Sequence, residues 1–227
     1  MKKIQEGDMV RTLCYFVVVA LSAAGLGTLV YAQKMSEPDP NEPRHIRGQV
    51  IKVDGSAIEV KTKSGEIVRI DLIDGMTVIG LTEGKFTKVD FGVYVGSVAV
   101  KLDEYSPIVR DSLSWLHEGY ELRIIDEELR GIAVGHRKWS LTPDTIIAHG
   151  WVDDIEDRVL SIKYGPTEEE ETDVEVGRDV PVLRMSLADK SLIKPDAHIF
   201  AGAQKNGNHQ YAAMFVFVGE NGLVPPL

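Results

Sequence analysis

A short stretch near the middle of the chain carries the side chains best suited to chemistry. Residues 131–141 read GIAVGHRKWSL, which places His136, Arg137 and Trp139 close together, with Arg130 just before them. A histidine titrates near neutral pH and binds metals, an arginine clamps anions through paired hydrogen bonds, and a tryptophan offers a stacking face. These four residues are therefore the candidate binding site.

The same stretch also fits a purely structural role, which we favour. Trp139 would then anchor the segment against the β-domains on either side, because a tryptophan covers a large apolar area. Arg137 would pair with a nearby carboxylate, and His136 would complete a hydrogen-bond network.

The histidine spacing gives little support to a metal site. None of the six histidines stands at the His-x-x-x-His distance, and a metal site needs three or four ligands. His136 and His149 are the pair that a domain junction would bring together. We therefore predict no metal and no cofactor. Periplasmic metal or redox-cofactor handling by His136 and His149 remains the alternative function.

No catalytic motif is present either. The chain has no Gly-x-Ser-x-Gly elbow and no dinucleotide or phosphate-loop fingerprint. We predict that the protein is not an enzyme, and no residue is assigned as catalytic. The net charge of -10, without a cluster of Lys and Arg, argues against nucleic acid as a partner.

The first 32 residues carry an export signal. Basic residues precede an apolar stretch, 12–32, and Val30 and Ala32 stand at the -3 and -1 positions of a signal-peptidase site. Cleavage at Ala32–Gln33 would make 1–32 a signal peptide. Without cleavage the stretch is an apolar helix that anchors the chain, and residues 12–32 are then its contact with the membrane. Either form places the rest of the chain outside the cytoplasmic membrane.

The cysteine count and the composition of residues 33–45 add two constraints on the fold. The single cysteine, Cys14, lies in the apolar stretch, which excludes an internal disulfide and a cysteine-based metal cluster. Residues 33–45 contain three prolines among charged residues, a composition typical of a disordered linker.

From residue 46 onward the hydrophobic pattern has a period of two. Ile58 and Val60 are predicted to point to one face, and after a Ser-Gly turn Val68, Ile70 and Leu72 continue that face. This alternation predicts a β-hairpin with one buried side.

Three phrases recur in the same order about a hundred residues later. GQVIKVDGSAIEVKT at Gly48 aligns with GWVDDIEDRVLSIKY at Gly150, the phrase at Ile70 aligns with the one at Thr172, and Lys88 aligns with Lys194. We interpret this as a tandem duplication. Since a five-strand sheet removes its edges by closing, each copy is expected to form a small antiparallel β-barrel of OB or SH3 type. One continuous sandwich is the alternative.

These observations predict a mainly β protein with the following domains: a first barrel at 46–134 with a helix inserted at 106–119, an inter-barrel linker at 135–147, and a second barrel at 148–227. The inserted helix rests on a capping serine, a following proline and a closing Gly119.

Several phrases together resemble a group of exported bacterial proteins of unknown function with small β-barrel domains. They are GQVIKVDGSAIEVKTKSGE, VYVGSVAV, ELRGIAVGHRKWSL, KSLIKPDAHIFAGAQ and VGENGLVPPL. The group shares the phrase Gly-His-Arg-Pro-Trp-Asp, in which this chain has Lys138 for the proline and Ser140 for the aspartate. Some members carry names that suggest a metal transporter permease, which the single apolar segment here contradicts.

The resemblance and the residues together lead to one expectation of function. We expect an envelope binding or accessory module without catalytic activity, located in the periplasm or on the outer side of the cytoplasmic membrane. It would contact a protein or envelope partner through barrel faces and through the 135–147 linker.

Overall fold

The computed structural model describes residues 44–102, 116–139, 141–206 and 210–226, which belong to one compact unit. The described part is mainly β, as the alternation of the sequence predicts. No helix within it is long and apolar enough to cross a membrane. The expected signal peptide or anchor at 1–32, including Cys14, lies outside the described residues. So does the expected linker up to residue 43, while Arg44 and His45 already belong to the first strand.

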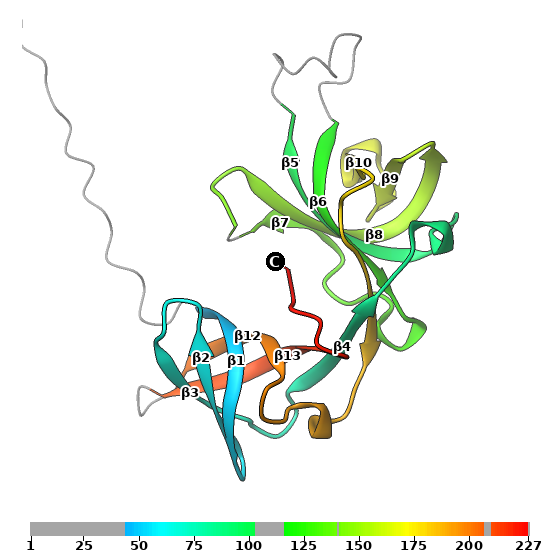
Figure 1. Cartoon of the computed structure of the whole chain (residues 1–227). Coiled ribbons are helices and arrows are strands. Elements are labelled where there is room, and N and C mark those ends of the chain that lie inside the picture. Colours follow the sequence, from blue (N-terminus) through cyan, green and yellow to red (C-terminus); the bar gives the residue numbers. More distant parts are fainter. Residues whose placement is uncertain (1–43, 103–115, 140, 207–209, 227) are drawn as a thin grey trace, which may run out of the picture. The chain divides into compact units, whose positions relative to one another are not determined.

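Thirteen strands are found in the described residues (Figure 1). The first seven are β1 (Arg44–Asp54), β2 (Ala57–Thr62), β3 (Ile67–Asp71), β4 (Thr77–Glu83), β5 (Tyr94–Lys101), β6 (His117–Ile125) and β7 (Gly135–Lys138). The other six are β8 (Thr145–Glu156), β9 (Val159–Lys163), β10 (Glu171–Glu175), β11 (Val182–Leu187), β12 (His198–Lys205) and β13 (Tyr211–Gly219). Short 3-10 helices are η1 (Phe86–Lys88), η3 (Glu127–Leu129), η4 (Glu168–Glu170) and η5 (Lys190–Leu192).

Five strands close into a barrel, which we call ring one. β1, β2 and β3 form an antiparallel meander, β3 pairs in parallel with β13, and β13 returns through β12 to β1. Ile58, Val60, Val68 and Ile70 point into this ring and are buried, which confirms the predicted hairpin. The alternating pattern therefore gave both the strands and their inner face.

A second closed set of pairings, ring two, joins β5, β6, β10, β9 and β8. β8 pairs with β5 and β9, β5 pairs with β6, and the parallel pair of β10 and β6 closes the ring. Its interior is filled by a separate apolar cluster that includes Val95, Leu122 and Leu160. The closure leaves β7 as an additional strand beside β8.

The rings do not follow the expected division at 46–134 and 148–227. Ring one takes β12 and β13 from the second half of the chain, and ring two takes β5 and β6 from the first half. The halves are exchanged because β4 leaves ring one beside β13 and pairs antiparallel with β11, where Leu81 lies opposite Met185. Period two fixes which face of a strand is buried, but it does not fix which strand is the neighbour.

The long strand β1 pairs with two strands and β8 with three, and a glycine allows each of these long strands to bend. A Cβ on Gly48 would overlap the carbonyl oxygen of Lys61, and a Cβ on Gly150 would overlap that of Lys163. A register shift follows in both strands, after Val50 and after Val152. Glycine is thus required where each barrel turns its corner.

Two further predictions differ from the structure. The expected linker 135–147 contains β7 and the start of β8, joined by a short turn, so this stretch is a hairpin rather than a free connection. The expected helix at 106–119 lies outside the described residues up to 115. Its last three positions belong to β6, because Gly119 pairs with Ala99 across the sheet.

Candidate functional site

A third apolar cluster lies outside both rings, where their strands meet. It combines Leu81 of β4 and Met185 of β11 with aromatic side chains, among them Tyr94 of β5 and both Phe200 and Phe217 of ring one. We call this region the junction. Its polar residues come from β1, β6, β7 and β8, and they form the candidate site.

The first polar feature of the junction is a buried ion pair on β6. The Nε of Arg123 donates a hydrogen bond to Oε1 of Glu121, and both side chains are almost fully buried. The Arg123 guanidinium also lies over two aromatic rings, 5.5 Å from the centre of Phe217 and 5.9 Å from that of Trp139. A buried pair of this kind is costly to remove from water and depends on full hydrogen bonding.

Arg47 of β1 adds a second guanidinium to the same region. It lies 4.4 Å above the centre of the Phe200 ring, directly across the β1–β12 pair. Burial lowers the Arg47 pKa, Arg123 lowers it further, and Glu121 raises it. The two arginines therefore interact with the same carboxylate.

Arg137 of β7 supplies the third guanidinium. Its Nη1 donates a hydrogen bond to the carbonyl oxygen of Ala133 at 3.3 Å. Although the side chain stays exposed, the surrounding protein and Arg123 lower its pKa, and the Tyr94 phenol raises it. The expected carboxylate partner of Arg137 does not appear among the ion pairs of the described residues.

Trp139 lies at the centre of these contacts. Its ring is 5.0 Å from that of His45 and 5.9 Å from that of Phe200, both in ring one, while Arg123 belongs to ring two. The side chain is partly buried and packs against the junction cluster. This is the arrangement expected of a structural anchor, since one residue contacts strands of both rings.

Two histidines flank the guanidinium groups. Burial lowers the His149 pKa to about 3, with further lowering by Arg123 and Arg137. Burial also lowers the His45 pKa, and Arg47 and Arg137 add to this effect. Both imidazoles are therefore neutral at physiological pH, because protonation would add a positive charge to an already cationic region.

Four buried polar atoms of the junction have no hydrogen-bond partner. They are Nη2 of Arg47, Oε2 of Glu121, Nε1 of Trp139 and Nδ1 of His149. A buried polar atom that makes no hydrogen bond within the chain costs about 1–3 kcal/mol. Two of the four are N–H donors, on Arg47 and Trp139.

The four sequence-predicted residues are not brought together. Arg137 and Trp139 take part in the junction, as described above. His136 is exposed, and the centre of its ring lies 5.3 Å from that of Tyr164 in a tilted contact. Arg130 is exposed and donates hydrogen bonds to the carbonyl oxygen of Gly92 and to Glu127.

The proposed pairing of His136 with His149 is excluded by the strand register. Gly135 lies opposite His149, and His136 lies opposite Ala148. Neighbouring residues of a strand alternate between faces, so the two imidazoles point to opposite sides of the β7–β8 pair. In addition, no three His, Cys, Asp or Glu side chains of the described residues are grouped as metal ligands.

Sequence reasoning missed most residues of the junction, among them His45, Arg47, Glu121, Arg123 and Phe200. Glu121 and Arg123 give a signal in retrospect, because they are charged residues at alternating positions beside the apolar residues that end β6. Arg47 and Phe200 give no such signal, since each occupies an ordinary outward position of a β-strand.

Comparison with protein-family models, with curated proteins and with solved structures finds no match for this chain.

Replacement of Trp139 tests the anchor role. Trp139→Ala removes the contacts of the indole with strands of ring one and ring two. We therefore expect the free energy of unfolding to fall by about 3 kcal/mol. Phe91→Ala is the matched control, because that aromatic side chain is 73% exposed and its loss should change stability by less than about 0.5 kcal/mol. Denaturant unfolding measures both. A loss at Trp139 as small as that at Phe91 would contradict the anchor role.

The neutral state of His149 predicts a pH dependence of stability. Its pKa is about 3 in the folded chain against 6.5 for the free group, so the unfolded chain binds more protons between these values. The stabilising contribution is complete above pH 6.5 and is lost as the pH falls. At pH 5 it should be smaller by about 2 kcal/mol.

The variant His149→Gln isolates this contribution. We expect its unfolding free energy to change less between pH 8 and pH 5 than that of the unmodified chain. The variant at the exposed His136, His136→Gln, should keep the full dependence. Equal pH dependence in His149→Gln and the unmodified chain would show that His149 is not buried in its neutral form.

Proposed function

We propose that the chain is an exported, non-catalytic binding module of the cell envelope that holds an anionic group of its partner at the junction. The observation that carries the proposal is the charge balance there. Arg47 and Arg123 share the carboxylate of Glu121, and the electrostatic neighbours of Arg137 are Arg123 and a phenol. An anion would relieve the repulsion among three guanidinium groups and accept from the unpaired donors on Arg47 and Trp139.

The non-catalytic part of the proposal is supported by the state of the histidines. A general base works best when its pKa lies near the operating pH. The His149 pKa of about 3 is far below that range, and the His45 pKa is lowered as well. Neither imidazole is adjusted for proton transfer, whereas the guanidinium groups are suited to hold an anion.

Export is supported by the sequence of residues 1–32, with its basic start, apolar stretch and small residues at Val30 and Ala32. In the envelope, the partner would be a protein or another surface component with accessible carboxylate or phosphate groups. The overall charge of -10 keeps such partners away from most of the surface. Contact is thereby directed to the cationic junction.

We further propose that the two rings descend from a tandem duplication. The pairing of Gly48 with Ile199 in ring one has its counterpart in the pairing of Gly150 with Val95 in ring two. This register makes Phe200 of ring one the counterpart of Gly96 in ring two. The correspondence is shifted by two residues from the one that the aligned sequence phrases suggest. The structural counterpart of Arg47 is then His149.

The counterparts differ most at the junction. Arg47 lies over Phe200 in ring one, while in ring two the His149 ring lies against Gly96, where a Cβ would be 2.6 Å from the imidazole. By the same register Arg123 replaces Phe217. Within otherwise similar pairings, the two copies have thus become different at the positions that build the cationic site.

The proposal predicts binding to isolated envelopes that depends on Arg137. The chain, purified as the producing cell makes it, would be mixed with envelope particles and sedimented at increasing salt. We expect Arg137→Gln to weaken binding about tenfold and salt to weaken that of the unmodified chain. Arg137 is exposed, so its replacement leaves the core intact.

The control removes the same charge elsewhere. Arg178 is an exposed arginine in the turn between β10 and β11, and Arg178→Gln should bind as the unmodified chain does. Fractionation of the same cells gives the location of the chain. Equal binding by the Arg137 and Arg178 variants, or recovery of the chain from the cytoplasm, would contradict the proposed function.

A further inference from the structure

A pocket of about 520 Å³ opens on the outer face of ring one, beside the junction. It lies over β1, β2 and β12, and the C-terminal segment that follows β13 forms its other wall. Its lining residues are Arg47, Gly48, Gln49, Lys61, Thr62, Lys63, His198, Ile199, Val224, Pro225 and Pro226. Arg47 therefore belongs both to the junction and to this pocket.

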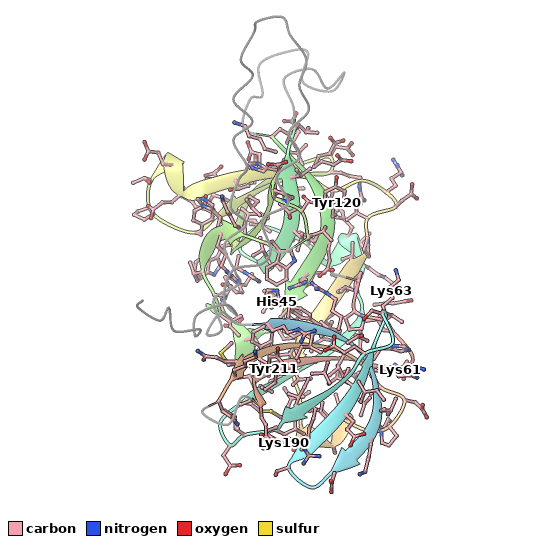
Figure 2. All side chains as sticks on the ribbon, turned by 90° about the vertical axis from the view of Figure 1, so that its left-hand side faces the viewer. His45, Lys61, Lys63, Tyr120, Lys190 and Tyr211 are labelled. Atoms are coloured by element: carbon pink, nitrogen blue, oxygen red, sulfur yellow. The ribbon has the colours of Figure 1, made fainter. Side chains whose placement is uncertain are left out.

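The strand register explains why the charged residues share one wall. Lys61 lies opposite Gln49, and Gln49 lies opposite His198, so the three side chains form a row across β2, β1 and β12. Arg47 precedes Gln49 by two positions on β1, which keeps it on the same face, and Lys63 lies in the turn that follows β2. Figure 2 shows Lys61 and Lys63 on the same side of this part of the chain.

The pocket is cationic in a chain that is strongly acidic. Arg47, Lys61 and Lys63 line it, and none of its lining residues is an aspartate or a glutamate. The Nη2 of Arg47 is buried and has no hydrogen-bond partner. Three cations around a concave space form a site for an anion.

The opposite wall is apolar. Val224, Pro225 and Pro226 line the pocket on the side of the C-terminal segment. Prolines have little conformational freedom to lose when a ligand binds, because the ring fixes their backbone. This wall suits the body of an organic ligand, while the strand wall suits its charged end.

We infer that this pocket binds a phosphate group carried on a small organic body. This inference rests on the proposed function, because it uses Arg47 as part of the anion-binding surface. Three cations favour the dianion of a phosphate monoester over a single carboxylate, and the ammonium groups of Lys61 and Lys63 are compact point charges that phosphate accepts well. The Arg47 guanidinium would supply the third positive charge at the end of the pocket that adjoins the junction.

The phosphate can belong to a free ester or to a lipid headgroup, and the experiment includes both. Inorganic phosphate and glycerol 3-phosphate represent the free form, with glycerol as the uncharged comparison. Vesicles of phosphatidylcholine, with and without phosphatidylglycerol, represent the membrane. Calorimetry measures binding, and the amide signals of Gly48 and Ile199 in an NMR titration locate it.

We expect saturable binding of glycerol 3-phosphate with shifts at the pocket amides. Lys61→Gln with Lys63→Gln should weaken it by about tenfold or more, and both side chains are exposed, so the fold should persist. Lys52→Gln is the matched control, because Lys52 lies on β1 outside the pocket and its side chain is 57% exposed. Arg47→Gln should weaken binding as strongly as the double variant.

Three results would overturn the inference: no saturable binding of either soluble phosphate, equal binding by the double variant and the Lys52 variant, or binding to anionic vesicles alone. The envelope assay with Arg137→Gln separates this outcome from the proposed function. If that variant still loses envelope binding while phosphate does not bind, the inference fails and the function stands. If phosphate binds at the pocket but envelopes do not bind the chain, the function fails alone.

Discussion

The constraint on which the structure depends is that neither half of the chain closes a barrel by itself. The first half supplies three strands to ring one and two to ring two, and the second half does the reverse. The antiparallel pair of β4 and β11, with Leu81 opposite Met185, carries the chain from one ring to the other. The outer faces of both rings are therefore forced to meet, and the junction is built from strands of both halves.

This constraint explains the unusual chemistry of the junction. A position that points out of a barrel normally faces water, where a charged side chain stays hydrated and has no desolvation cost. Here the outward positions of β1 and β6 face each other, so Glu121 and Arg123 are buried and Arg47 is half-buried. Three guanidinium groups against one shared carboxylate leave the region short of negative charge, and the unpaired donors add to this shortage. The adjoining pocket gives a ligand access to Arg47.

Much of the fold follows from the sequence, and much of the site does not. The alternation at Ile58, Val60, Val68 and Ile70 predicted strands, buried face and barrel class. The exchange between halves was not predictable, because the alternating pattern fixes the buried face of a strand but does not specify its neighbour. Trp139 was identified from its residue type. Arg47 and Phe200 became part of the site only through the exchange, which places distant outward positions together. The predicted pairing of His136 with His149 fails for a simple reason. The two residues are offset by one position in the β7–β8 register, so their side chains point to opposite faces of the sheet.

The exchange of strands is most directly tested by a cysteine pair across β1 and β12. Gln49 and His198 lie opposite each other in the antiparallel ladder, where Cα atoms are about 4.5–5.5 Å apart and a disulfide can form. Gln49→Cys with His198→Cys, in a chain whose Cys14 is replaced by serine, would be oxidised and mapped by mass spectrometry. The account predicts a disulfide within one monomeric chain that joins the peptides of β1 and β12. Two free thiols, or a disulfide that links two chains, would contradict it.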